Sequence, residues 1–171
     1  MKTIFKYFVI LLVLSALTVL IYKTIVKLNY KEAVKERITT LPGMRMLTAD
    51  SISFSIANLV NDKYLVLVWY NTGCEHCQYE AQEFRKNPGS YGLTQILLVS
   101  GEPLSDIRKF GKTYGVDTLQ YLKLMHCDFQ AFFNTFGTTS VPSIFIYSPD
   151  GRLLKQYNGE TKLEAITKYL K

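Results

Sequence analysis

The chain is poor in the residues that build metal clusters and disulfide frameworks. Its 171 residues include three cysteines, two histidines and one tryptophan. A structural zinc site normally takes four Cys or His ligands, yet no second Cys-x-x-Cys pair accompanies Cys74 and Cys77. Internal repeats and low-complexity segments are also lacking. These absences exclude a repeat architecture, argue against disorder and leave a structural zinc site short of ligands.

The sequence also lacks a basic patch with interleaved aromatic residues, the usual sign of a nucleic-acid interface. The formal net charge is +6, but much of the excess lies in lysines that flank or follow an N-terminal apolar run. Near a bilayer such lysines meet lipid headgroups. We therefore expect no nucleic-acid partner. The lysines concerned are Lys2, Lys6, Lys23, Lys27, Lys31 and Lys35.

Residues 7–22, YFVILLVLSALTVLIY, carry no charge. A membrane-spanning helix needs roughly 20 apolar residues, so this run is at the short end, where the lysines on either side can snorkel. A cleaved signal peptide would need a small-x-small site, which residues from Thr24 onward do not offer, and no cysteine follows to take a lipid. A buried soluble helix would show a polar face. We predict an uncleaved anchor at 7–22 after a short tail at 1–6.

The remaining chain is predicted to form a charged stalk at 23–40 and one domain at 41–171, which begins at Leu41-Pro42-Gly43. Strands alternate with helices, and a hairpin and a last helix follow, an order typical of an α/β sheet with parallel and antiparallel parts. The predicted strands are 44–47, 52–54, 63–70, 94–101, 122–125, 143–148 and 153–157, and the predicted helices are 74–85, 104–114, 129–136 and 162–170.

The segment NTGCEHCQYEAQEF, residues 71–84, places Cys74 and Cys77 at the start of a predicted helix that directly follows a buried strand. Free backbone amides and the helix dipole stabilise a thiolate at that position. Cys77 lies one turn further along on the same side, so its sulfur can reach that of Cys74. We expect Cys74 to attack a disulfide and Cys77 to resolve the mixed disulfide.

The residues between the cysteines are expected to tune the reactive thiol in opposite directions. A cationic His76 would stabilise the thiolate of Cys74, and Glu75 would oppose it. A structural disulfide is a weaker alternative because a four-residue loop gives little gain in chain entropy. A metal site would have to recruit His126 or Cys127. The strand–turn–helix context favours a redox centre.

Three segments carry a resemblance to a known family: LVLVWYNTGCEHCQYEAQEF, ILLVSGE and FGTTSVPSIFIYSPDGRLLKQYNG. They resemble the thioredoxin-like fold, and more closely the membrane-anchored, extracytoplasmic thioredoxins of the TlpA/ResA kind, in forms familiar from Bacteroidetes-type bacteria. The resemblance covers residues 41–171. It implies a central mixed β-sheet flanked by helices, in addition to the N-terminal transmembrane helix.

The resemblance also implies that Val141-Pro142 is a cis-proline loop lying against the active-site sulfurs. In this family the backbone of the residue before the proline pairs with an extended substrate segment, in the manner of strand addition. We therefore predict that Val141 and Pro142 bind substrate. A plain proline at the start of a strand is the structural alternative for Pro142.

Two positions depart from the family pattern. Val68 is apolar where many thioredoxins bury an acid beneath the second cysteine, and Gly73 stands where a tryptophan often precedes the first. Proton transfer at Cys77 would then need another group or water. Glu80 and Glu83 are candidates by spacing alone, although such glutamates more often form a solvated helix face.

Together these observations predict a membrane-tethered thiol–disulfide oxidoreductase that acts on protein disulfides or dithiols without a bound cofactor or metal. The resemblance favours a reductase, supplied by a membrane electron donor, on a single-pass anchor in the inner membrane with its domain in the periplasm. His76 argues for a more oxidising couple. The alternative is a copper-binding chaperone that uses both thiolates and a histidine, and a peroxidase ranks last. Cys127, as a lone cysteine, is given no role.

Overall fold

The computed structural model describes residues 2–56, 59, 62–92 and 94–170, which divide into two compact units between Glu36 and Arg37. Helix α1 (Lys2–Thr39) forms the whole of the described first unit and ends inside the second. By length and composition alone, this helix can cross a membrane. The predicted anchor at 7–22 and all of the predicted stalk at 23–40 except Thr40 therefore lie on one continuous helix.

The apolar stretch of α1 also satisfies its own polar groups. The Ser15 and Thr18 hydroxyls donate to carbonyls one turn earlier, over 2.8 Å each, and Thr24 does the same. Between Ile4 and Tyr22 the described side chains are exposed and almost all apolar. The helix therefore pairs its interior backbone groups and these three hydroxyls within the segment, which membrane insertion requires.

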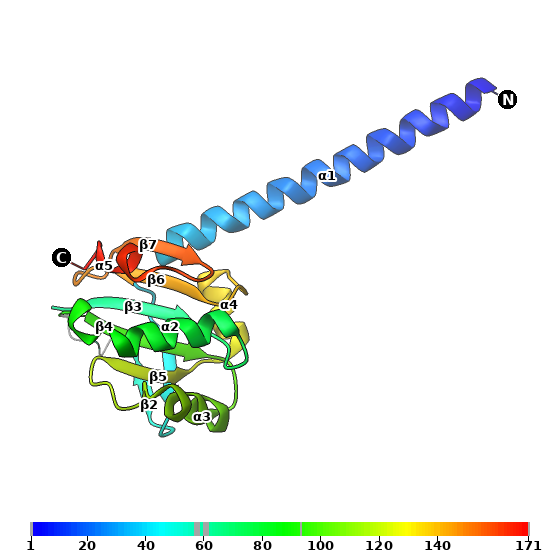
Figure 1. Cartoon of the computed structure of the whole chain (residues 1–171). Coiled ribbons are helices and arrows are strands. Elements are labelled where there is room, and N and C mark those ends of the chain that lie inside the picture. The colour runs from blue at the N-terminus through cyan, green and yellow to red at the C-terminus, as the bar shows by residue number, and fades with distance from the viewer. Residues whose placement is uncertain (1, 57–58, 60–61, 93, 171) are drawn as a thin grey trace. The chain divides into compact units, whose positions relative to one another are not determined.

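The second unit is built on a seven-stranded mixed sheet in the order β2-β1-β5-β4-β3-β6-β7 (Figure 1). Strands β3, β4 and β5 are parallel, and the other neighbours pair antiparallel. The strands are β1 (Arg45–Thr48), β2 (Ser53–Ser55), β3 (Tyr64–Trp69), β4 (Thr94–Ser100), β5 (Leu122–His126), β6 (Ser143–Tyr147) and β7 (Leu153–Asn158). The helices are α2 (Glu75–Lys86), η2 (Pro88–Ser90), α3 (Leu104–Tyr114), α4 (Phe129–Phe136) and α5 (Leu163–Thr167).

Helices cover both faces of this sheet. Side chains of α2, α3 and α5 share one core cluster with Val66 and Val68 of β3. On the opposite face the α4 side chain Phe132 stacks on Trp69 with ring centroids 4.0 Å apart. Because both faces of β3 and β4 are covered, these strands are continuous apolar runs rather than alternating ones.

Helix ends follow ordinary capping chemistry. Asp128 caps α4, with its side chain accepting from the Ala131 amide over 2.9 Å. Gly115 and Gly137 end α3 and α4 in the left-handed conformation, at φ 63° and 65°. The two glycines therefore end the helices and let the chain turn towards the next strand.

The last turn of α1 belongs to the second unit. The Ile38 side chain is buried and its carbonyl accepts from the Tyr147 hydroxyl over 3.2 Å, while Arg37 donates to the Asn134 carbonyl. The end of the predicted charged stalk is therefore part of the packed domain. Elsewhere, the predicted strands and helices agree with the structure to within a few residues.

Candidate functional site: the cysteine pair at the start of α2

The turn before the cysteines is held in place by Glu102, which lies just beyond β4. Its carboxylate accepts from the Asn71 side-chain amide at 2.9 Å and from the Thr72 backbone amide at 2.6 Å. Asn71 in turn accepts from the Gly73 amide at 2.9 Å through its side chain. This network fixes the path of the chain from β3 into the helix, so the side chains of Glu102 and Asn71 help to set the position of the first cysteine.

Cys74 and Cys77 lie together at the N-terminus of α2. Cys74 is the N-cap residue, and its sulfur accepts from the Cys77 amide at 3.4 Å. The Cys74 thiol donates to the Val141 carbonyl at 3.9 Å. Cys74 is partly exposed, whereas Cys77 is only 3% exposed. Burial, followed by the interaction with Cys74, raises the pKa of Cys77 far above its ordinary value. The geometry suits an accessible first thiol and a protected second one.

The loop before β6 lies beside these sulfurs. The Val141–Pro142 peptide bond is cis. Val141 is partly exposed next to Cys74, while Pro142 is buried and its carbonyl accepts from the Gly159 amide at 2.8 Å. The Ser143 hydroxyl donates to the Ser140 carbonyl at 2.7 Å, which closes the loop from within.

The two residues between the cysteines both point to solvent. Glu75 is exposed, and no described hydrogen bond or ion pair ties it to the sulfurs. His76 is also exposed, and its Nδ1 lies 2.6 Å from a carboxylate oxygen of Glu160. The imidazole predicted to act on Cys74 thus already has an acidic partner.

Glu80 corrects the interpretation that the helix glutamates form a solvated face. It is 2% exposed, and its Oε1 accepts from the Thr161 amide at 2.6 Å. Burial is the main reason why the pKa of Glu80 is raised to about 7; the Thr161 hydrogen bond opposes that rise, and the charges of Glu160 and Glu83 add to it. The Glu80 charge in turn contributes to the raised pKa of Cys77.

A signal for this burial was present in the sequence. The buried positions of α2 are Cys77, Glu80, Ala81 and Phe84, an i, i+3, i+4, i+7 stripe that faces the core. Glu80 occupies the second position of that stripe. Its hydrogen-bond partner Thr161 lies 81 residues further on and had no sequence signal.

These features bring together a cysteine pair at a helix N-terminus, a facing X-Pro loop and a mixed sheet. A family model described as a thioredoxin-like domain matches residues 55–171. The chain belongs to this thioredoxin-like family. The predicted fold class, a mixed sheet flanked by helices, is thereby confirmed.

Solved structures share the fold of this thioredoxin-like domain at low sequence identity. Mycobacterium tuberculosis dsbF, in mixed oxidized and reduced forms, is 20% identical with a TM-score of 0.63, over 77% of this chain and 92% of that one. The thioredoxin domain of a Bacteroides vulgatus thiol-disulfide oxidoreductase is 16% identical with a TM-score of 0.66, over 78% and 97%. StoA from Bacillus subtilis is 14% identical with a TM-score of 0.58, over 77% and 98%. No curated protein matches this chain in sequence.

The remaining histidine and cysteine are engaged elsewhere in the thioredoxin-like domain. His126 Nδ1 lies 2.9 Å from the Glu102 carbonyl. Cys127 is buried, with its sulfur 3.5 Å from that of Met44. Among the described residues, no group of three or more His, Cys, Asp or Glu side chains could hold a metal. No contact in this part of the chain favours the copper-chaperone alternative.

Two shallow pockets lie beside the cysteine pair. One, of about 290 Å³, adjoins Val141 and has a partly aromatic lining; the other, of about 310 Å³, adjoins Gly73 and the side of α3. Both are open enough for a side chain of an extended peptide. The first is lined by Trp69, Tyr70, Asn71, Ser100, Gly101, Glu102, Phe129, Thr139 and Val141, and the second by Thr72, Gly73, Asp106, Lys109, Phe110, Thr113 and Tyr114.

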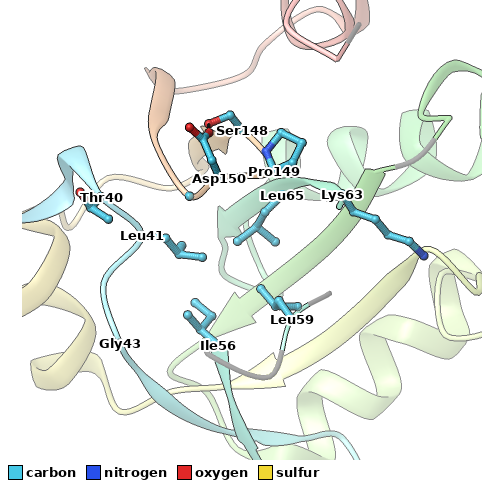
Figure 2. Close-up of a pocket in the computed structure, with 11 residues that line it drawn as sticks. Thr40, Leu41, Gly43, Ile56, Leu59, Lys63, Leu65, Ser148, Pro149 and Asp150 are labelled. Atoms are coloured by element: carbon cyan, nitrogen blue, oxygen red, sulfur yellow. Dashed lines mark hydrogen bonds between the residues drawn. The ribbon is translucent and has the colours of Figure 1, made fainter. Parts of the chain in front are cut away.

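A larger pocket, of about 460 Å³, lies at the other end of β3 (Figure 2). Leu65 at the beginning of the strand lines it, whereas the cysteines follow Trp69 at the strand's end. Figure 2 shows that the turn at 148–150 faces Leu41 and Ile56 across this space. Its described lining holds no cysteine or histidine, and it lies apart from the cysteine pair at the start of α2.

Proposed function

We propose that the chain is a membrane-anchored thiol–disulfide oxidoreductase that acts on protein disulfides or dithiols outside the cytoplasm. The arrangement of the two thiols carries this proposal: Cys74 is accessible at the N-terminus of α2, and Cys77 is buried one turn away with its amide 3.4 Å from the Cys74 sulfur. A nucleophilic thiol next to a protected resolving thiol is what thiol–disulfide exchange requires.

In the reducing direction, the Cys74 thiolate attacks one sulfur of a client disulfide, and the other client sulfur leaves as a thiolate. The Cys77 thiolate then attacks the Cys74 sulfur, and the second client sulfur leaves. The client gains two electrons and two protons. The chain ends with a Cys74–Cys77 disulfide, which a membrane-bound dithiol donor must reduce before the next cycle.

The client segment is proposed to pair with the backbone of Val141. This carbonyl already accepts from the Cys74 thiol, so a strand laid along it would bring its own sulfur close to Cys74. The pocket between Val141 and Phe129 would then receive a side chain next to the client cysteine. These features support an extended protein segment, rather than a small molecule, as the substrate.

Glu80 is proposed to accept the proton of Cys77. A buried thiol with a raised pKa needs a base before it can attack, and a carboxyl with a pKa of about 7 can accept and return a proton near neutral pH.

The proposed location is the inner membrane, with α1 as a single-pass anchor and the domain in the periplasm. The support is the apolar stretch of α1 and the oxidising environment in which such chemistry is used. An alkaline phosphatase reporter fused after the C-terminus tests the orientation, because that enzyme is active only outside the cytoplasm. An inactive reporter fusion would overturn the location but not the chemistry.

The reduction potential of the Cys74–Cys77 couple tests the chemistry. The full chain, in detergent micelles, is equilibrated with glutathione buffers, and Cys127→Ser removes any contribution from the third thiol. A reversible two-electron couple near about −270 mV supports a reductase, and one near about −120 mV indicates a disulfide donor instead. The absence of a reversible couple would overturn the proposal.

A further inference from the structure

The loop between β7 and α5, residues 159–161, touches three separate parts of the proposed redox site. None of its three residues has a role in the proposed disulfide exchange. Each of them, however, contacts a residue near the cysteine pair. In chain order, the Gly159 amide donates to the Pro142 carbonyl at 2.8 Å, Glu160 Oε2 pairs with His76 Nδ1 at 2.6 Å, and the Thr161 amide donates to Glu80 Oε1 at 2.6 Å.

The contact between Glu160 of this loop and His76 of α2 is a poor candidate for a stabilising contact. Its side chains are 67% exposed at His76 and 43% exposed at Glu160. Exposed pairs of this kind contribute little to stability, because water screens the charges and both side chains lose conformational freedom. The contact does show that the Glu160 carboxylate lies beside the cysteine helix, although Glu160 is 84 residues further along the chain than His76.

That carboxylate acts on the buried acid of the site. Glu160 directly precedes Thr161, whose amide binds Glu80, and the Glu160 charge helps to keep the pKa of Glu80 raised. The other titratable groups that interact with Glu80 are Glu83 and Cys77 on α2 and Tyr91 after η2. Among these groups, Glu160 is the one that lies on the loop between β7 and α5.

We propose that Glu160 is a positioning residue whose carboxylate, next to His76 at the start of α2, sets the protonation state of Glu80 and so the pH range in which Cys77 is deprotonated. The inference rests on the proposed function, because it assigns Glu80 the proton of Cys77. It assigns an effect on the protonation of Glu80 to the loop between β7 and α5, and this loop carries none of the reacting groups. A negative charge at position 160 keeps Glu80 protonated to higher pH than burial alone would.

The test is the titration of the Glu80 carboxyl in the full chain, reduced and in detergent micelles. Glutamate labelled with ¹³C at the carboxyl is followed by NMR, and the Glu80 signal is assigned by its loss in Glu80→Gln. Glu160→Gln should move the Glu80 midpoint to lower pH by roughly 0.2 to 0.7 pH unit, the size expected of one exposed charge. Glu160→Lys should move it further in the same direction.

Glu164→Gln is the matched control, because it removes an exposed carboxylate on α5 that is not among the charges acting on Glu80. Fluorescence of Trp69 checks that each variant is folded. If Glu160→Gln and Glu160→Lys leave the Glu80 midpoint where the control leaves it, the proposal is wrong.

A second measurement separates this inference from the proposed function. The pH dependence of exchange with a peptide disulfide should shift with the Glu80 midpoint in Glu160→Gln and return toward the native profile in Glu160→Asp. A shifted Glu80 midpoint with an unshifted rate profile would overturn the proton-accepting role of Glu80, while leaving the charge coupling to Glu160 supported.

Discussion

Replacing Glu80 by glutamine should make the domain more stable at alkaline pH. Glutamine keeps the side-chain oxygen that accepts from the Thr161 amide at 2.6 Å, so the hydrogen bond survives. What disappears is the ionisable group, which is 2% exposed and must carry its charge in the protein interior above neutral pH. Burial of that charge opposes folding.

The magnitude follows from the pKa of Glu80, which rises from 4.5 to about 7 on folding. Because the folded chain binds the proton more tightly, the stability contributed by the protonated carboxyl is complete below about pH 4.5 and is lost as the pH rises through about 7. At about 1.4 kcal/mol for each pKa unit, the loss amounts to about 3 kcal/mol. The advantage of Glu80→Gln over the native chain should grow by this amount between pH 4 and pH 8.5.

The assay is urea unfolding of both chains, reduced and in the same detergent, at several pH values. Trp69 is the single tryptophan, is buried against Phe132 and lies in the domain, so its fluorescence reports domain unfolding alone. The difference between the two chains cancels the titration of every group that does not interact with Glu80. A difference that stays constant from pH 4 to pH 8.5 would refute the reasoning, since it would mean that the buried carboxyl is not titrating in this range.

Three further perturbations test the packing and the turn. Phe132→Ala should lower the free energy of unfolding by about 3–5 kcal/mol, because it removes the ring stacked on Trp69; a loss below about 1 kcal/mol in urea unfolding would contradict this. In the native chain at pH 8, iodoacetamide should modify Cys74 well before Cys127, because burial raises the pKa of Cys127 to about 11; mass spectrometry of digests would show the reverse order if this is wrong. Glu102→Ala should slow exchange with a peptide disulfide roughly 10- to 100-fold in stopped-flow assays without unfolding the domain, because it frees the turn before the cysteines; an unchanged rate would show that the turn holds itself.

Much of the fold was predictable because its strongest signals are local. The runs at 64–69 and 96–99 are continuous and apolar, as strands buried on both faces must be. The stop at Asn87-Pro88 and the glycine after Tyr114 end their helices by chemistry that a sequence displays directly. The length of α1 was harder to predict, because a charged helix and a charged linker share one composition.

The site was predictable only as far as its local pattern extends. The position of Cys74 and Cys77 at the start of a helix was predictable because their spacing and the preceding strand are contained within one short segment. The partners of the surrounding groups come from far along the chain, as with Glu160 beside His76, and no periodicity reports such a pairing. The tuning predicted for His76 did not include this second charge. Side-chain neighbours set by tertiary structure are the part that sequence reasoning could not supply.

The apolar Val68 on β3 and the buried Glu80 on α2 are related, because the acid near Cys77 lies on the helix instead of on the strand. Val68 lies on β3, 1% exposed, in the same core cluster as Cys77. An acid at that strand position would be surrounded by apolar side chains, whereas an acid on α2 can accept a backbone hydrogen bond from Thr161. The helix position therefore places a carboxyl one turn from Cys77 with a backbone amide to bind it, and the charge of Glu160 on the 159–161 loop adds to the rise in the pKa of that carboxyl.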